Sequence, residues 1–250
     1  MKNFITKNRL ISFLAILFLF IIWKLVSLYA GSEQLIPSPE KTILAVFDVV
    51  SRENFWPALI TTIGRGLIGF SISLVLAILI GIPAGIYTTI RLLINPVLIT
   101  FRSTPIISLI LLAIILLGNE MVPVFIAILT MFPIMCTNII DGIRKVDPDL
   151  IEMGTTFQIS KERIIREIYL PSISPFLTSG ISNALGFGWR AIIIGEVIAQ
   201  PEFGVGTQMQ NAQIFLQVSE LIAWTLIAIL VSSVFEALVR LVEKKLVRWK

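Results

Sequence analysis

Long apolar stretches alternate with short polar segments along most of the chain. A helix needs about 20 mostly apolar residues to cross the ~30 Å hydrocarbon layer. Six stretches supply them, at residues 10–30, 59–86, 94–117, 121–140, 173–199 and 219–242. They are far longer than strands and show no two-residue alternation, and an open sheet could not satisfy its backbone in lipid. The pattern predicts an all-α membrane protein with six transmembrane helices and one transmembrane domain over residues 1–250.

The polar segment 147–171 is the longest interruption of this pattern. Asp147 followed by Pro148 is a helix-start signal, because proline needs no N–H partner in the first turn. A one-sided apolar stripe then follows at Leu150, Met153 and Phe157. The segment is therefore predicted to begin with a short amphipathic helix.

A second short helix is predicted in the same segment. Ser160 can cap it, charged residues surround its isoleucines, and Pro171 is expected to end it. Two short amphipathic helices in a membrane protein suggest a docking surface for a partner in water. The alternative is a loop, spanning residues 141–171, that lies on the membrane surface.

The composition supports a membrane protein and narrows its chemistry. The chain has 56% hydrophobic and 14% charged residues, whereas soluble proteins carry about 25% charged residues. It has no histidine and one cysteine, which excludes His-based catalysis and an internal disulfide. The net charge of +4 comes from basic residues beside apolar stretches rather than from one basic face, so we expect no nucleic-acid partner.

The basic residues also predict the orientation. If the N-terminus is inside and six spans follow, most Lys and Arg residues fall on the cytoplasmic side, and only Lys41 and Arg52 fall outside. The positive-inside rule then places both termini and residues 147–171 in the cytoplasm. Residues 10–30 also resemble the start of a signal peptide, but their length favours an uncleaved spanning helix.

The chain lacks the motifs of an ATPase or a hydrolase. No Gly-Lys pair occurs, so there is no phosphate-binding loop, and no G-x-S-x-G occurs either. A Ser–Lys dyad is the one catalytic arrangement that counting leaves open. We therefore expect a protein that is not an enzyme and that needs no cofactor or metal.

Two ionisable residues lie inside the fifth apolar stretch, where each must face a bundle interior or water. Arg190 and Glu196 are about 120° apart on a helix, so they are not expected to pair with each other. Either they line a translocation pathway, or Glu196 lies near the outer interface and Arg190 pairs with a neighbouring helix. Trp189 and two asparagines near the inner ends of spans, Asn138 and Asn183, complete the candidate pathway residues.

Residues 152–171 resemble the pattern E-A-A-x(3)-G-x(9)-I-x-L-P of permease subunits of binding-protein-dependent ABC importers. The first glutamate is Glu152, and the terminal Ile168, Leu170 and Pro171 have the required spacing. Met153 and Gly154 replace the alanines, and Gln158 replaces the glycine, so a positive φ there would be strained. The resemblance implies that this loop is the coupling helix that contacts the ATPase, through the matching positions and Phe157.

From Trp23 to Arg248 the chain resembles type I importer permeases of the sulfonate, nitrate and taurine branch. The resemblance implies a five-helix core with one added N-terminal helix, a homodimer in a bacterial plasma membrane, a separate ATP-binding subunit and an extracytoplasmic solute-binding protein. The alternatives are an ion-gradient-driven secondary transporter and an uncoupled channel or scaffold.

Overall fold

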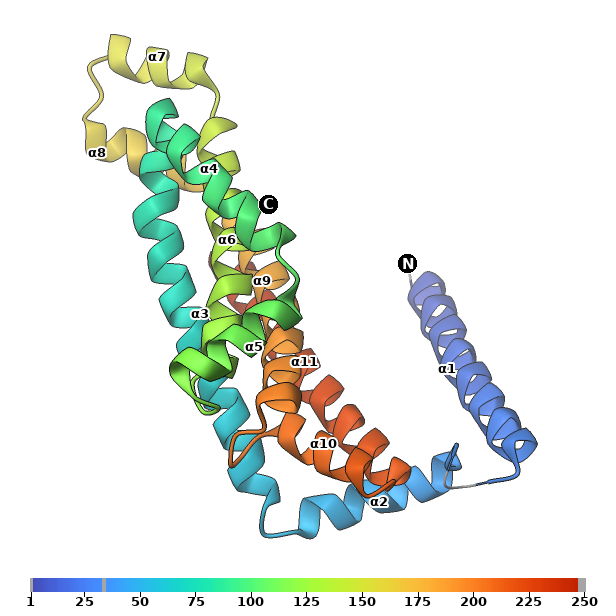
Figure 1. The fold of residues 1–250 in the computed structure, drawn as a ribbon. Coiled ribbons are helices and arrows are strands. Elements are labelled where there is room, and N and C mark those ends of the chain that lie inside the picture. The colour runs from blue at the N-terminus through green and yellow to red at the C-terminus, as the bar shows by residue number, and fades with distance from the viewer. Residues whose placement is uncertain (1, 33–34, 247–250) are drawn as a thin grey trace.

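The computed structural model of the chain describes residues 2–32 and 35–246, and every regular element within them is helical (Figure 1). The elements are α1 (Lys2–Ala30), α2 (Pro39–Ser51), α3 (Phe55–Ile86), α4 (Thr88–Ser103), α5 (Ile106–Leu117), α6 (Val122–Arg144), α7 (Pro148–Thr156), α8 (Lys161–Ile164), the π-helical turn η1 (Ile165–Tyr169), α9 (Leu170–Ala199), α10 (Val205–Ile214) and α11 (Val218–Leu246). The prediction of an all-α membrane protein is confirmed.

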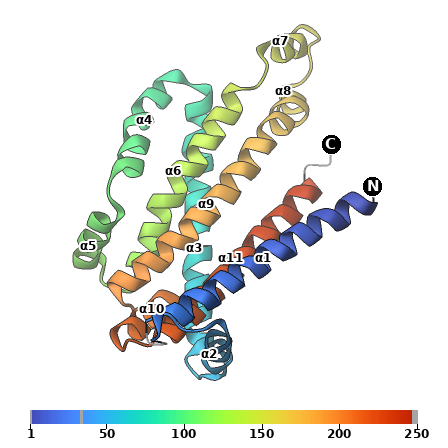
Figure 2. The same cartoon turned by 90° about the vertical axis from the view of Figure 1, so that its right-hand side faces the viewer.

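The three helices α3, α6 and α9 form the centre of the fold. One buried cluster joins Ala77 of α3 to Met131 and Met135 of α6 and to Ile192 of α9. Figure 2 shows α6 and α9 side by side with α3 behind them. The central position of α6 explains why its apolar side chains are buried on several faces rather than along one stripe.

Small residues let α3 approach α6 closely. A Cβ added at Gly81 would lie 3.1 Å from Cβ of Ile139, and one added at Gly85 would lie 2.8 Å from Cβ of Ile143. Contacts this short leave no room for a side chain, so the two backbones pack directly through the glycines. The small residues of α3 are thus used for packing within the chain.

The apolar stretch 94–117, predicted as one of the six spans, does not form one continuous helix. It is divided between α4 and α5, whose axes are bent by 96° at the break. Pro105 follows Thr104 at this point, and Thr104 is extended with φ −74° and ψ 131°. A residue before proline is disfavoured in the helical region, so the helix ends there although the composition stays apolar.

The prediction that Pro171 ends the second short helix of the loop is wrong. Helical structure runs without interruption from Lys161 to Ala199, over 39 residues. Pro171 lies in the first turn of α9, directly after the π turn η1, in which the Leu170 N–H bonds to the Ile165 carbonyl. Because π turns change the local hydrogen-bond register, the chain passes the proline without leaving the helix.

Within residues 2–32 and 35–246, four helical stretches are long and apolar enough to cross a membrane: Phe55–Ile86, Val122–Arg144, Lys161–Ala199 and Val218–Leu238. The bent pair α4 and α5 would make a fifth span if both parts cross together. In α1 the apolar part that qualifies by composition is the shorter segment Leu14–Ala30. The count of six spans, and the assignment of the whole chain to one transmembrane domain, therefore stay predictions.

The helix α1 lies apart from the core in Figure 1 and is held mainly at its end near α2. The indole Nε1 of Trp23 donates to the Pro37 carbonyl at 3.0 Å. Lys24 pairs with Glu40 at 2.8 Å and lowers the pKa of that carboxyl. Along the rest of α1 most large apolar side chains from Leu14 to Leu28 are exposed.

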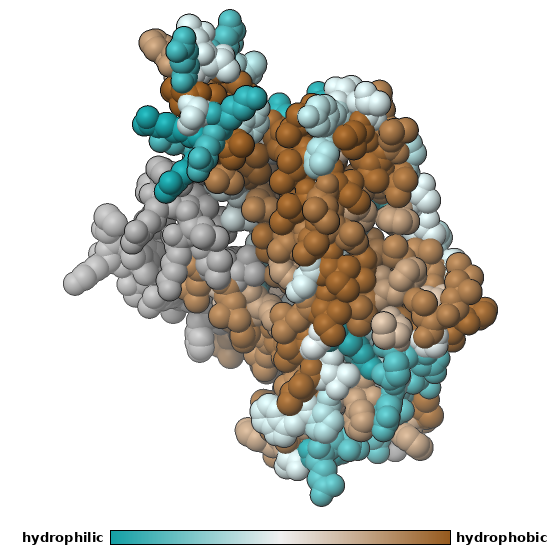
Figure 3. Space-filling model, turned by 90° about the vertical axis from the view of Figure 1, so that its left-hand side faces the viewer, coloured by the Kyte–Doolittle hydropathy of each residue, from teal (hydrophilic) through white to brown (hydrophobic). Residues whose placement is uncertain are grey.

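Polar and apolar surfaces divide the molecule into three zones along its long axis. Figure 3 shows a broad apolar zone between two polar ends. The zone includes exposed side chains of α3, α5 and α11, such as Leu79, Ile115 and Leu230. One polar end carries α7 and α8, and the other carries α2, α10 and the turns beside them (Figure 1). This division matches a lipid-facing belt with two aqueous ends.

Candidate functional site

The segment 147–171 folds largely as its capping signals predict. The Asp147 carboxylate accepts a hydrogen bond from the Asp149 N–H at 2.9 Å, and Pro148 lies in the first turn of α7. The Ser160 hydroxyl accepts from the Arg163 N–H at 3.4 Å at the start of α8. Both predicted helix starts are confirmed, and the two helices lie together at one end of the molecule (Figures 1 and 2).

A tight turn at Gln158 joins the two short helices. Gln158 has φ 54°, in the left-handed region that favours glycine. Its N–H bonds to the Thr155 carbonyl at 3.0 Å, and the next N–H, of Ile159, bonds to the Gly154 carbonyl at 2.9 Å. These two bonds form a Schellman motif, whose left-handed position is usually glycine. The glycine of the permease pattern therefore has a physical reason, and Gln158 occupies its conformation at a cost.

Gly154 fixes how α7 rests on α8. It is buried, and a Cβ added there would lie 3.3 Å from both Cγ1 and Cδ1 of Ile164. Ile164 is itself buried. The permease pattern has alanine at this position, and glycine allows the two helices to lie slightly closer than alanine would. The loop is therefore a packed unit rather than two independent helices.

The outer face of α7 is apolar and exposed. Leu150, Met153 and Phe157 are 42%, 48% and 74% exposed, although they belong to a polar end of the molecule. Glu152, beside them, is also exposed. Among the other residues of the pattern, Leu170 is exposed, whereas Ile168 and Pro171 are half-buried. An apolar stripe that is left open in water is typical of a protein contact surface.

Arg190 lies in the middle of α9 and faces outward. Its guanidinium carbon lies 5.9 Å from the centre of the Phe187 ring. Among the described residues no carboxylate lies within ion-pair distance of it. It lines a hollow of about 300 Å³ between α9 and α11, together with hydroxyl groups of α11 such as Thr225 and Ser232. The neighbouring Trp189 is buried and donates from Nε1 to the Ala228 carbonyl at 3.1 Å.

The two candidate asparagines have separate surroundings. Asn138 donates from Nδ2 to the Ile134 carbonyl of its own helix at 2.8 Å, and its Cβ would lie 2.7 Å from a Cβ added at Gly180. It therefore lies where α6 and α9 cross. Asn183 is exposed and donates to the Ser179 hydroxyl at 3.5 Å. The structure does not bring these residues together with Arg190 in one contact.

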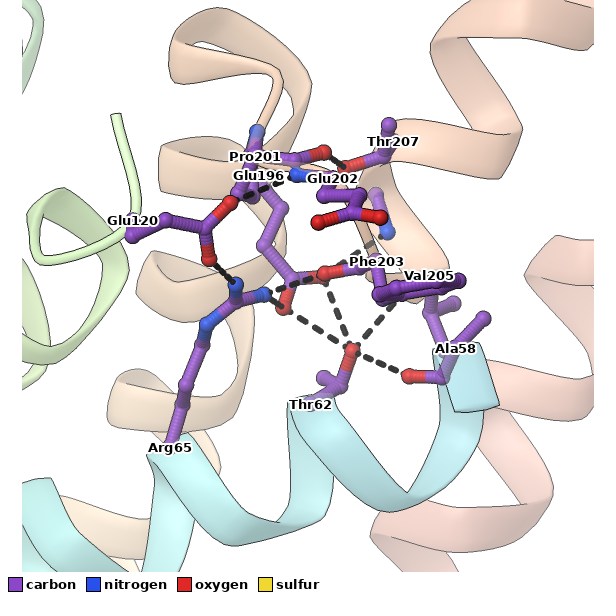
Figure 4. Close-up of polar contacts among 11 residues, drawn as sticks. Ala58, Thr62, Arg65, Glu120, Glu196, Pro201, Glu202, Phe203, Val205 and Thr207 are labelled. Carbon is purple, nitrogen blue, oxygen red and sulfur yellow. Dashed lines mark hydrogen bonds and ion pairs between the residues drawn. The ribbon is translucent and has the colours of Figure 1, made fainter. Parts of the chain in front are cut away.

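Glu196 is completely buried near the C-terminal end of α9, and its contacts are with groups of this chain. Its carboxylate accepts from Arg65 Nη1 at 2.8 Å, from Thr62 Oγ1 at 2.9 Å and from the Gly206 N–H at 2.9 Å (Figure 4). Charge-assisted bonds of this kind compensate the cost of burying an ion. These contacts pair the Glu196 carboxylate with groups of this chain.

The network continues from Arg65 to two further segments at the same end of the molecule. Arg65 donates from Nη1 to the Phe203 carbonyl at 2.6 Å and from Nη2 to Glu120 at 2.6 Å. The other oxygen of Glu120 accepts from the Glu202 N–H at 2.7 Å. Figure 4 shows these groups converging from α3, the turn before α6, and the loop after α9. These ends of α3, α6 and α9 are therefore joined by one set of charged groups.

The sequence argument did not assign Thr62, Arg65 and Glu120 to a site. A signal was present, because Arg65 is a cation within the second predicted span and such a cation needs a partner. Its partners lie 55 and 131 residues away in sequence, in other helices and turns. No local spacing could connect them.

Comparison with known families decides the class of the protein. A family model described as binding-protein-dependent transport system inner membrane component matches residues 73–248. This chain belongs to that family. One relative of the permease is the putative aliphatic sulfonates transport permease protein of Bacillus subtilis. The two proteins are 28% identical over 92% of this chain and 83% of the relative.

Two further relatives of the permease carry names with other solutes. The taurine transport system permease protein of Escherichia coli is 22% identical over 91% of this chain and 84% of that protein. The bicarbonate transport system permease protein of Synechococcus elongatus is 25% identical over 67% of this chain and 60% of that protein. The predicted membership in the sulfonate, nitrate and taurine branch of ABC importer permeases is confirmed.

Proposed function

We propose that two copies of this permease enclose the solute pathway of an ABC importer, with a separate ATP-binding subunit on each copy and an extracytoplasmic solute-binding protein. Family membership carries the permease role, since its relatives are ABC transporter permease subunits. The dimer follows from the size of the unit, because so few spanning helices must pair to enclose a pathway. No phosphate-binding loop occurs in the chain, so ATP hydrolysis belongs to the partner.

The loop formed by α7 and α8 is the proposed contact with the ATP-binding subunit. The observation that carries this assignment is the exposed apolar stripe of Leu150, Met153 and Phe157 beside the exposed carboxylate of Glu152. Apolar side chains at the centre of a contact and charges at its rim are the usual composition of a protein interface. We place this loop and both termini in the cytoplasm, because the basic residues gather on that side.

The opposite end of the molecule is the proposed contact with the solute-binding protein. It carries the loop 200–204 and α10, which follow directly on α9. ATP-dependent closure of the ATP-binding subunits would bring the two copies of the α7–α8 loop together. The packed helices would then move between an inward-open and an outward-open arrangement.

The solute is proposed to be a small anion. The relatives' names refer to aliphatic sulfonates, taurine and bicarbonate, and each of these carries an anionic group. Arg190, exposed in mid-helix without a carboxylate partner among the described residues, is a proposed pathway residue. Trp189 and Asn183 lie on the same helix, and Asn138 lies on α6. Glu196 is assigned instead to the outer polar network.

The substitution Glu152→Lys tests the coupling assignment. We expect normal amounts of permease in the membrane, weaker co-purification of the ATP-binding subunit, and loss of ATP-driven uptake in proteoliposomes. The matched control is Glu162→Lys, which makes the same charge change in the first turn of α8, at a position that the permease pattern leaves unspecified. Equal ATPase binding and uptake for Glu152→Lys and wild type would refute the coupling contact. Uptake driven by an ion gradient without ATP would favour a secondary transporter.

A further inference from the structure

A second cationic cavity lies at the break between α4 and α5. Its volume is about 340 Å³, and it is lined by Arg102 and Thr104 at the break, by Thr130 of α6 and by Phe187 of α9. The break exists because Pro105 prevents the helix from continuing. Interrupted helices in transporters commonly mark solute or ion sites, since irregular backbone in a membrane is tolerated where it lines a cavity.

The cavity lies near the middle of the membrane-crossing part. Thr130 and Pro133 are in the central part of α6, which runs from Val122 to Arg144, and Phe187 is in the central part of α9. Lipid head groups lie about 15 Å from the bilayer centre. A head group is therefore an unsuitable ligand, whereas a solute crossing the membrane must pass this depth.

The charge of Arg102 has little compensation within the described part of the chain. The side chain is exposed, and the hydrogen bond found for it is a long one, 3.5 Å from Nη1 to the Thr137 hydroxyl. No acidic residue is among the described residues that line the cavity. A guanidinium at this depth is costly without a partner. The first turn of α5 starts at Ile106 on the same wall, which adds the positive end of a helix dipole.

The remaining lining of the cavity is mostly apolar, including Ile106, Leu109 and the Phe187 ring. The hydroxyls of Thr104 and Thr130 donate to carbonyls of their own helices, at 2.7 Å and 2.8 Å. Because these two hydroxyl protons are already used, Arg102 is the main hydrogen-bond donor available to a ligand in the cavity. A guanidinium presents parallel N–H groups that match two oxygens of one oxyanion. An apolar wall beside it suits a short alkyl group.

We propose that this cavity binds an aliphatic oxyanion, such as an alkyl sulfonate or carboxylate, and that Arg102 is its recognition residue. The proposal rests on the permease function above and names the solute class that the pathway takes. Arg102 holds the charged oxygens, and the α5, α6 and α9 side chains hold the alkyl part. An anion without an alkyl part, such as bicarbonate, gains only the contact with Arg102.

The first test compares Arg102→Gln with wild type in proteoliposomes that contain the permease, its ATP-binding subunit and its solute-binding protein. We expect unchanged yield of assembled complex and about tenfold lower ethanesulfonate uptake per complex, because a charge-assisted contact is lost. Arg91→Gln, the same change on the same helix but outside this cavity, should keep normal uptake. Bicarbonate uptake by wild type is expected to be weaker than ethanesulfonate uptake.

A chemical rescue separates charge from shape. In a Cys136→Ser background, Arg102→Cys is treated with 2-aminoethyl methanethiosulfonate, which adds an ammonium group, or with the neutral methyl reagent. Uptake should recover severalfold only with the ammonium group, and excess ethanesulfonate should slow the modification. Recovery with both reagents, or with neither, would overturn the recognition role.

The outcomes distinguish this proposal from the permease function. If wild type shows no ATP-driven uptake of any solute, the proposed function fails regardless of Arg102. If wild type takes up solute and Arg102→Gln matches it per complex, Arg102 is not the recognition residue. A lower yield with normal uptake per complex would mean that Arg102 pairs with another subunit.

Discussion

Two groups of arginines in the apolar zone differ in how their charge is compensated. Arg65 is 6% exposed and pairs with Glu196 at 2.8 Å and Glu120 at 2.6 Å. Arg102 and Arg190 are exposed, with a long hydroxyl contact and an aromatic ring as their partners in the described part of the chain. The charge of Arg65 is compensated within the chain, so this arginine serves the fold. The second pair leaves charge available to a solute or another subunit.

The difference shows that the presence of an ionisable residue in a span does not by itself assign a role. The number of partners within the chain separates the cases. A buried charge with hydrogen bonds on every side is costly to disturb and serves the fold. An exposed charge at the same depth costs the fold little when it is removed, so its loss should appear in transport instead.

Arg65→Gln should give the largest effect. It leaves the Glu196 carboxylate buried without its cation, which typically costs about 3–5 kcal/mol. We expect a strongly lowered thermal midpoint of the detergent-solubilised permease and a low yield. The double variant Arg65→Gln/Glu196→Gln should recover part of this loss, because the unpaired charge is gone. A midpoint equal to that of wild type in the single variant would show that the outer network is not structural.

Gly206→Ala should have the next largest effect on stability. A Cβ there would lie 2.5 Å from the Ile193 carbonyl oxygen and 2.7 Å from Cβ of Glu196. Forcing such contacts typically costs about 1–3 kcal/mol, and it would push the outer loop off the carboxylate. Gly186→Ala is the matched control, because nothing lies within 4 Å of its Cβ position. The thermal midpoint should fall for Gly206→Ala and hold or rise for Gly186→Ala. Equal midpoints would contradict the packing described here.

Arg190→Gln should leave stability intact and affect transport. We expect normal assembly and roughly tenfold lower uptake per complex, as for the loss of one charge-assisted contact. The measurement is complex yield and uptake on the same sample. Low yield with proportionate uptake would place Arg190 among the structural arginines and remove the contrast with Arg65.

Gln158→Gly should give the smallest effect and a positive one. Gln158 has φ 54°, and a left-handed conformation costs a residue with a Cβ about 1 kcal/mol relative to glycine. We expect a slightly raised thermal midpoint, unchanged ATPase association and normal uptake. A lowered midpoint would show that the Gln158 side chain makes a stabilising contact that outweighs its backbone strain.

The sequence predicted what depends on local signals. The apolar stretches and the starts of α7 and α8 at Asp147 and Ser160 follow from residues within a few positions of one another. The break at Pro105 was missed because the stretch 94–117 is apolar on both sides of it. A run of apolar residues does not show whether the helix axis changes direction within it. Pro171 was misjudged because a π turn precedes it, which no residue pattern announced.

The network around Glu196 shows that contacts between distant residues could not be predicted from the sequence. Glu196 was recognised as a buried charge, but its contact with Arg65 joins positions 131 residues apart. Which face of α9 meets which face of α3 depends on packing among several helices. The sequence argument did not single out Arg102, because its place in a cavity depends on the 96° bend between α4 and α5.

The uninterrupted helix from Lys161 to Ala199 connects the α7–α8 loop at one end of the molecule with the network around Glu196 at the other. At 39 residues and about 1.5 Å per residue it is about 58 Å long, nearly twice the ~30 Å hydrocarbon layer. One end supports α7 through Ile164, and the other carries Glu196, which holds the outer loop at Gly206. A lever pivoted in the membrane moves its two ends in opposite directions. Under the proposed function, drawing together the α8 ends of two such helices would spread their opposite ends without any hinge between them.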